Sequence, residues 1–187
     1  QALQRLVDRG LLTRRRGVGT IVSPRHVHRP MELTSLMRDL VDAGHKVHTT
    51  IQRYEARPAT ETEADALKVT EGTLVVHIER TRFTNSEPIA VLTNLIPADI
   101  APTMQELESN SLYDMMRERG VTLASARQVI GARTATTKEA KLLSEHRGAA
   151  LLTTQRTTYD PSGRVVEYGD HIYRASRYSF EANLFAQ

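Results

Sequence analysis

The sequence contains no cysteine and no hydrophobic run long enough to cross a bilayer. Without thiols, the chain can form neither a disulfide framework nor a thiolate metal site. A membrane-spanning helix needs about 20 consecutive apolar residues, which no stretch of the 187 residues offers, and a signal-peptide pattern is also missing. These absences predict a soluble, cytoplasmic protein with no membrane partner.

Motifs of the common catalytic classes are missing as well. There is no phosphate-binding Walker motif and no nucleophile elbow. Seven histidines are present, but the pairs His26 with His28 and His45 with His48 have no Asp, Glu or Cys at a recognisable ligand spacing. We therefore expect no metal, no cofactor and no catalytic residue.

Charge is distributed unevenly along the chain. Residues 1–30 hold seven arginines and one aspartate, whereas the remainder holds 18 Lys and Arg against 21 Asp and Glu. A basic head on a mildly acidic body indicates that the head contacts a polyanion. Because the chain begins at Gln1, inside a helical pattern, we expect a further segment upstream.

The basic head combines a helical pattern with a hairpin pattern. Apolar residues at helical spacing precede Gly10, which can end a helix, and two β-capable runs between Thr13 and Val22 flank a Gly-x-Gly tip. A β-wing that carries arginines can follow DNA phosphates or enter a minor groove. The alternative is a solvated basic hairpin without a partner. The candidate DNA-binding residues are Arg5, Arg14, Arg15, Arg16, Gly17 and Gly19.

The body of the chain contains an internal repeat. Residues 57–83 resemble residues 133–159 at a constant offset of 76, so that Arg80, for example, recurs as Arg156. Each copy has the pattern of a strand end, a short helix, a Gly turn, a long strand, a polar turn and a returning strand. The repeat predicts an α+β domain with one mixed or antiparallel sheet, helices on one face and a shared core. Two further helices are predicted at residues 34–43 and 111–119.

Two arginines lie on the predicted inner face of one strand. In residues 74–83, every second position lies on the same face of a strand. Arg80 and Arg82 therefore share a face with Leu74, Val76 and Ile78, which mark that face as core. Buried guanidinium groups need partners. Either internal carboxylates neutralise them or a bound anion does, since arginine matches the geometry of phosphate and carboxylate groups.

The two copies of the repeat differ at positions suited to binding. Arg82 corresponds to Thr158, and at the same offset Glu167 corresponds to Val91. We expect a site in one half, where the halves differ, with Tyr173 on the same strand face as Glu167. The predicted helix starts at Thr34, Ser35 and Ser111 add hydrogen-bond donors, although ordinary helix capping also explains these three residues.

Several segments together carry a family resemblance. In the head, a helical pattern is followed by Gly-Leu-Leu, a basic arm and Gly-x-Gly-Thr, in this order. In the body, the segments are residues 79–82, 111–113 and 156–178. The chain resembles the HutC-type branch of the GntR superfamily of transcriptional regulators, whose UTRA effector-binding domain has a chorismate-lyase-like fold. The resemblance implies the C-terminal part of a winged helix-turn-helix in residues 1–23, a linker in 24–30 and a UTRA domain in 31–187. Many members have Asp where Ser176 stands, a difference without an evident functional consequence.

The resemblance also implies a function and a site. It implies a homodimeric repressor that binds a double-stranded DNA operator and a small anionic effector, such as a phosphorylated sugar or amino sugar. In the sugar-phosphate sensors of this branch, the positions that contact the effector match Leu33, Thr34, Ser35, Arg80, Arg82, Ser111, Glu167 and Tyr173. Arg156 and Thr93 are weaker candidates for the same cavity.

Two alternatives remain open at this point. The first is a chorismate-lyase-like enzyme that uses Arg80, Arg82 and Glu167 on a small acidic substrate, although an enzyme has no evident use for a basic wing. The second is a sensor for a lipid or an aromatic acid, because a fold alone does not identify its ligand.

Overall fold

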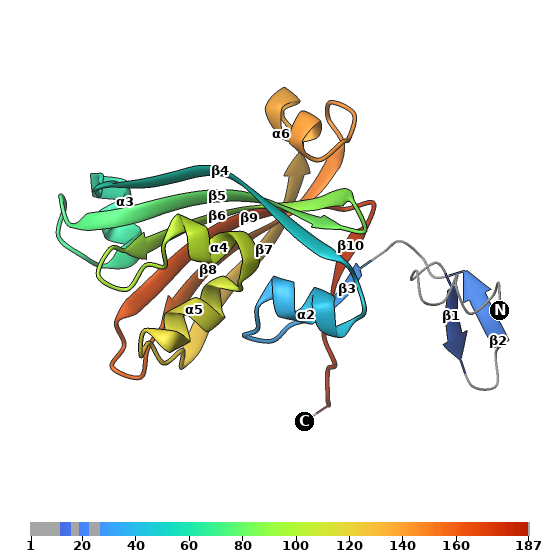
Figure 1. Ribbon diagram of the computed structural model, residues 1–187, viewed down its shortest axis with the longest axis horizontal. Coiled ribbons are helices and arrows are strands. Elements are labelled where there is room, and N and C mark those ends of the chain that lie inside the picture. Colours follow the sequence, from blue (N-terminus) through green and yellow to red (C-terminus); the bar gives the residue numbers. More distant parts are fainter. Residues whose placement is uncertain (1–11, 16–18, 23–26, 187) are drawn as a thin grey trace.

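The computed structural model describes residues 12–15, 19–22 and 27–186 (Figure 1). Its strands are β1 (Leu12–Arg15), β2 (Gly19–Val22), β3 (Val27–Pro30), β4 (Val47–Pro58), β5 (Leu74–Thr84), β6 (Glu87–Pro97), β7 (Ser125–Thr134), β8 (Ala150–Tyr159), β9 (Val165–Arg174) and β10 (Tyr178–Glu181). Its helices are α2 (Leu36–Asp42), α3 (Glu61–Leu67), α4 (Met104–Ser109), α5 (Leu112–Glu118) and α6 (Thr137–Leu142).

A six-stranded sheet forms the body, in the order β4-β5-β6-β9-β8-β7. One copy of the repeat supplies β4, α3, β5 and β6, and the other supplies β7, α6, β8 and β9. The copies join along β6 and β9, where Thr93 pairs with Asp170 near the middle of the interface. A pseudo-two-fold axis near this pair relates the halves. The predicted single sheet is confirmed, and all of its pairings are antiparallel.

The repeated helices lie on one face of the sheet and have the same local chemistry. Leu67 at the end of α3 packs with Val75 of β5, and the matching Leu143 after α6 packs with Leu151 of β8. Each helix begins with a Thr-x-x-Glu capping box, and the box glutamate accepts two hydrogen bonds of 2.6–2.7 Å from an arginine on the preceding strand. These features explain much of the sequence repeat as helix capping and packing.

The opposite face is covered by α2, α4 and α5 (Figure 1), whereas the repeat led us to expect helices on one face. Leu107 of α4 and Met116 of α5 pack with Ile78, and Leu40 of α2 packs with Leu92. The repeat revealed only the helices that it contains. Because the inner strands carry apolar residues on both faces, the second face also has to be covered.

The two hairpins of the repeat differ by one residue in their turns. Each has a β-bulge at the same place, but Arg82 pairs with Ala90 whereas Thr158 pairs with Glu167. The turn after β8 is therefore one residue longer than the turn after β5. The structural counterpart of Glu167 is Ala90, and the predicted match with Val91 is wrong.

The first described strands form a separate hairpin. β1 and β2 pair antiparallel with Arg15 opposite Gly19, which confirms the predicted hairpin and places Arg14 and Arg15 in β1. The predicted helix in residues 1–10, together with Arg5, Arg16 and Gly17, lies outside the described residues. Part of the expected linker is the strand β3, which pairs in parallel with β10. None of the described helices combines the length and the hydropathy of a membrane span.

Candidate functional site

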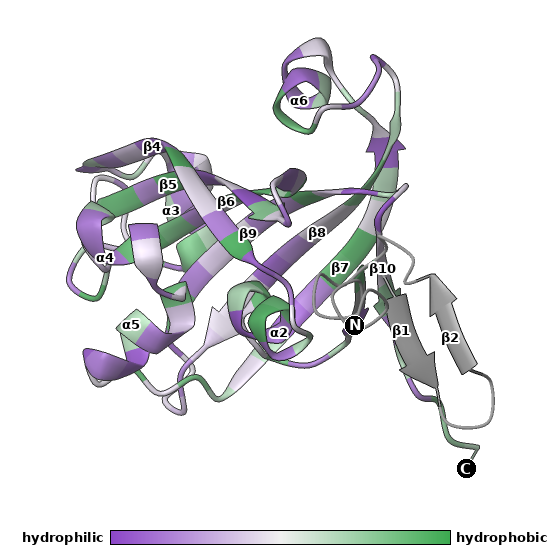
Figure 2. Ribbon diagram, turned by 45° about the vertical axis from the view of Figure 1, so that its right-hand side comes forward, coloured by the Kyte–Doolittle hydropathy of each residue, from purple (hydrophilic) through white to green (hydrophobic). Residues whose placement is uncertain are grey.

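Polar side chains occupy the middle of the sheet face that α2 and α5 cover, between two apolar clusters. Val76 and Ile78 belong to the cluster beneath α4 and α5, and Leu92 to the cluster beneath α2. The strands accordingly carry bands of both hydrophilic and hydrophobic residues (Figure 2). Val76 and Ile78 are buried as predicted, whereas Leu74, the first residue of β5, is 54% exposed and does not belong to the core.

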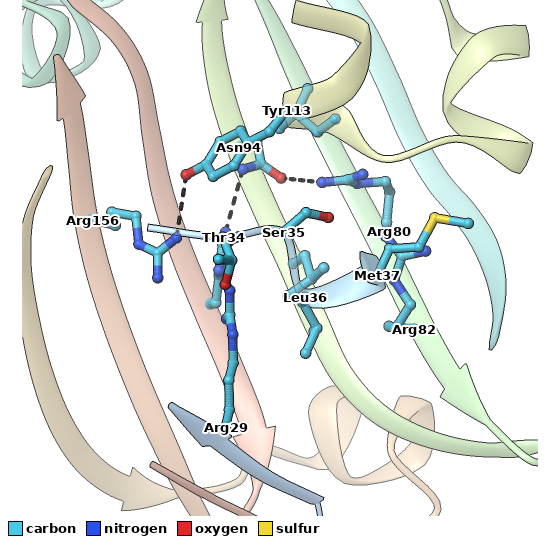
Figure 3. A pocket seen from close by; sticks show the side chains of 13 residues that line it. Arg29, Thr34, Ser35, Leu36, Met37, Arg80, Arg82, Asn94, Tyr113 and Arg156 are labelled. Carbon is cyan, nitrogen blue, oxygen red and sulfur yellow. Dashed lines mark hydrogen bonds between the residues drawn. The ribbon is translucent and has the colours of Figure 1, made fainter. Parts of the chain in front are cut away.

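A cavity of about 40 Å³ lies between this face and residues at the start of α2 (Figure 3). It brings together four of the predicted effector-binding residues, namely Thr34, Ser35, Arg80 and Arg82, and the weaker candidate Arg156. The other lining residues are Arg29, Leu36, Met37, Leu92, Asn94, Leu112, Tyr113 and His171.

Arg80 and Arg82 are buried with part of their hydrogen-bonding capacity unused. Arg80 Nη2 donates to Asn94 Oδ1 at 2.6 Å, and Arg82 Nη1 donates to the Thr49 hydroxyl. Within the described part of the chain, Nε and Nη1 of Arg80 and Nε of Arg82 have no acceptor. Burial lowers the pKa of Arg80 to about 10, and burial together with the charge of Arg80 lowers the pKa of Arg82 to about 9. Since unpaired buried donors cost free energy, an anion in the cavity would be stabilised.

Glu167 lies behind the cavity and organises its wall. The fully buried carboxylate accepts from Asn94 Nδ2 at 2.7 Å, from Thr158 Oγ1 at 2.8 Å and from the Tyr113 hydroxyl at 3.2 Å. Burial raises the pKa of Glu167. Asn94 stands between Arg80 and this carboxylate, because its amide binds both. Arg80 is therefore held in place without a direct ion pair that would compete with a ligand.

A glycine makes this close packing possible. Gly169 lies opposite both Asn94 and Arg156 on the neighbouring strands. A Cβ atom at this position would lie 2.7 Å from Glu167 Oε1 and 2.7 Å from His171 Nε2. Any other residue would push the side chains of Glu167 and His171 apart.

The cavity takes residues from both halves of the repeat rather than from one half. Arg80 and its counterpart Arg156 approach it from the strands on either side of the central pair. Arg156 Nε donates to Gln128 Oε1 at 2.7 Å, and its Nη1 donates to the Tyr113 hydroxyl at 3.3 Å. Burial, followed by the charges of Arg156 and Arg80, lowers the pKa of His171 well below its usual value, so this imidazole is neutral.

Several candidate residues border the cavity or lie away from it. Leu33 lines a neighbouring groove, and Ser111 lines a groove between α2 and α5. Tyr173 stacks on Tyr178, with its hydroxyl 3.2 Å from His171 Nδ1. Thr93 lies on the opposite face, in a groove beside α6.

Sequence reasoning missed four polar residues of the cavity: Arg29, Asn94, Tyr113 and His171. In the sequence, Tyr113 belongs to one of the segments that carry the family resemblance, and Arg29 counts only toward the charge of the basic head. Two signals were available. Asn94 interrupts an apolar strand, and His171 lies at alternate positions with Glu167 and Tyr173, on the face already selected.

Comparisons with known proteins agree with this fold. The family model described as "UTRA domain" matches residues 42–179. The transcriptional repressor NagR of Bacillus subtilis is 33% identical over 183 residues, which cover 96% of this chain and 75% of the relative. The crystal structure of PhnF from Mycobacterium smegmatis superimposes with a TM-score of 0.80 at 25% identity, covering 100% of this chain and 84% of that one.

A transcriptional regulator from Streptomyces coelicolor is 48% identical, with a TM-score of 0.69, over 76% of this chain and 96% of that one. These relatives are transcriptional regulators, and the chain is accordingly a regulator rather than an enzyme of the lyase type. The chain belongs to the HutC-type branch of the GntR superfamily, and its body is a UTRA effector-binding domain.

Proposed function

We propose that this protein represses transcription by binding a double-stranded operator, and that a phosphate monoester, a phosphorylated sugar or amino sugar, controls this binding. The observation that carries the proposal is the pair of buried arginines, Arg80 and Arg82, with unused donors beside a cavity. Phosphate groups offer several acceptor oxygens to such forked donors.

Charge balance favours a dianion. Four guanidinium groups line the cavity, from Arg29, Arg80, Arg82 and Arg156. Among the described residues, two carboxylates lie close to them: Asp39 bonds Arg29, and Glu167 acts on Arg80 and Arg156. The walls therefore carry about two uncompensated positive charges. A phosphate monoester, with a charge of about −1.5 to −2 at pH 7, neutralises them more fully than a single carboxylate does.

The volume of the cavity indicates where each part of the effector lies. A cavity of about 40 Å³ has room for roughly three waters, which suits a phosphate group but not a whole hexose. Arg156 is shared with an adjacent groove of about 330 Å³ between Leu33 and Gln128. The sugar would extend toward this groove after the segment of residues 31–35 shifts, with the phosphate held at Arg80 and Arg82.

The basic head would supply the contact with DNA. We assign residues 1–23 to the end of a winged helix-turn-helix, in which Arg14 and Arg15 on β1 would contact the phosphate backbone. Operator binding requires two copies if the operator is palindromic. We propose a homodimer, in which the effector shifts the spacing of the two DNA-binding parts and weakens operator binding.

Calorimetry tests the proposal. We expect glucosamine 6-phosphate or glucose 6-phosphate to bind, and the parent sugars without phosphate to bind far more weakly. Arg82→Ala should reduce ester affinity at least about tenfold, the cost of removing a charge-assisted hydrogen bond from a buried site. Arg117→Ala, which removes an exposed arginine of α5, is the matched control. If Arg82→Ala leaves ester affinity unchanged, the site assignment is wrong.

A further inference from the structure

We infer that Arg29 contributes a further guanidinium to the bound anion and thereby ties occupancy of the cavity to β3, the strand that follows the basic head. This inference rests on the proposed anion site. Arg29 is 3% exposed and lines the same cavity as Arg80 and Arg82. Its side chain extends from β3 toward Thr34, on the cavity side of α2 (Figure 3).

Arg29 connects three parts of the chain at one point. Its Nε donates to Asp39 Oδ2 of α2 at 2.9 Å, and its Nη2 donates to the Thr34 carbonyl at 2.7 Å. The Thr34 hydroxyl donates to the same Asp39 oxygen at 2.7 Å. β3, the segment before α2 and α2 itself are therefore joined through a single guanidinium, at the edge of the cavity that Thr34 and Ser35 also line.

Asp39 is the internal counterion of Arg29 and would compete with a ligand for it. An anion that enters beside Thr34 meets a guanidinium that is already partly neutralised. The bound anion would then attract the Arg29 guanidinium from the cavity side. The Asp39 carboxylate, on the other side, would weaken the attraction between Arg29 and the ligand. Removing the negative charge of Asp39 should therefore improve anion binding, even though it removes a contact of Arg29.

The backbone attachment of β3 is short, so the Arg29 side chain matters to it. β3 pairs over four residues with β10, in a two-stranded parallel sheet, and short two-stranded sheets are marginal on their own. At its ends, the amide of Val27 donates to the Arg177 carbonyl at 2.7 Å, and the amide of Met31 donates to the Glu181 carbonyl at 3.0 Å. An anion that holds Arg29 should reduce the opening of this pair.

Two variants distinguish an anion contact from a mere tether of α2. The probes are glucosamine 6-phosphate and inorganic phosphate, titrated by calorimetry into the full chain. We expect Arg29→Gln to bind both roughly tenfold or more weakly, Arg29→Lys to fall between it and the unaltered protein, and Asp39→Asn to bind equally or more tightly. Arg38→Gln, an exposed arginine of α2 that pairs with Asp114, should change neither affinity.

A second readout follows the strand itself. Saturating glucosamine 6-phosphate should slow hydrogen exchange at the amides of Val27 to Met31 in the unaltered protein and in Asp39→Asn, but not in Arg29→Gln. The inference is overturned if Arg29→Gln binds like the unaltered protein, or if Asp39→Asn loses as much affinity as Arg29→Gln, which is the behaviour of a tether. If the unaltered protein binds neither probe, the proposed function fails as well. If the unaltered protein and Arg29→Gln bind the probes equally well and only Arg82→Ala loses affinity, the inference about Arg29 is overturned but the proposed function stands.

Discussion

Arg80 and Arg82, in the proposed site, illustrate how a core position can be kept for a ligand. Both lie on a strand face whose other members are apolar, and the nearest carboxylate, Glu167, is separated from Arg80 by the amide of Asn94. A direct ion pair would satisfy the arginine permanently. An amide orients the guanidinium through one nitrogen while leaving its charge uncompensated, which is what a reversible anion site requires.

The charge of the site predicts a pH dependence. Compared with glucose 6-sulfate, which keeps one negative charge, glucose 6-phosphate should bind at least about tenfold more tightly at pH 8. Below about pH 6, the ester takes up its second proton, so this advantage should shrink toward unity. Burial lowers the pKa of His171 well below its usual value and raises the pKa of Glu167. Protonation of Glu167 would favour the more highly charged ester and would therefore oppose this trend. Calorimetry between pH 5 and 8 measures the ratio; a ratio independent of pH would contradict a dianion site.

At the scale of secondary-structure elements, the duplication separates structural residues from those of the proposed site. The residues that the two halves share most clearly cap and pack α3 and α6, on the face away from the cavity. The halves differ where the site lies, as in Arg82 against Thr158 and Ala90 against Glu167. Arg80 and Arg156 are the exception, since both line the cavity.

This separation predicts that the helix caps can be weakened without affecting binding. Thr60→Ala and Thr136→Ala each remove a capping side chain and should lower the free energy of unfolding by about 1 kcal/mol. The double variant should show nearly the sum, because the caps belong to separate elements. Urea unfolding measures these losses. Ester affinity from calorimetry should stay unchanged in all three variants, and a clear loss of affinity would show that the repeat helices support the site after all.

At the scale of the whole molecule, β7 is an unprotected edge of the sheet. Within the described chain it pairs with β8 alone, and every residue of β7 except Gln128 is exposed, including Val129 at 45% and Ile130 at 38%. Long exposed edges favour pairing with another strand. The proposed homodimer could satisfy this edge by placing two copies of β7 side by side about a two-fold axis.

The absence of cysteine makes this arrangement easy to test. Antiparallel neighbours have Cα atoms about 4.5–5.5 Å apart, within reach of a disulfide. In a two-fold strand pair only the residue at the axis faces its own copy, and neighbouring residues point to opposite faces. Single cysteines along β7, such as Val129→Cys and Ile130→Cys, should therefore differ: the variant nearest the axis should give a disulfide-linked dimer under mild oxidation, resolved by non-reducing electrophoresis, and its neighbour should not. Thr62→Cys, on the exposed side of α3, should not. Equal cross-linking of all three variants, or a monomer in sedimentation of the unaltered protein, would contradict the β7 interface.

Much of the fold and part of the site followed from the sequence. The repeat, the hairpin, the Ser35 cap of α2 and the inward direction of Arg80 and Arg82 are local features, set by periodicity and turn chemistry. Ser111 begins α5 as predicted, but its hydroxyl makes no capping hydrogen bond. On the second face, α2 and α5 were predicted and α4 was not. The repeat could not show that these helices cover the face opposite α3 and α6, because they lie outside its two copies. The register after β8 was also mispredicted, since one extra turn residue shifts every later correspondence.

The sequence by itself determined a duplicated α+β domain, its likeness to the UTRA regulators and two arginines that required an anionic partner. Only the tertiary structure shows that several nitrogens of these arginines have no acceptor within the described chain, and that Arg29, Asn94, Tyr113 and Arg156 meet at the same cavity. The physical reason is that side-chain periodicity fixes the face on which a residue lies. The neighbours it meets there come from β3, β6, α5 and β8, and the packing of the whole sheet brings these elements together.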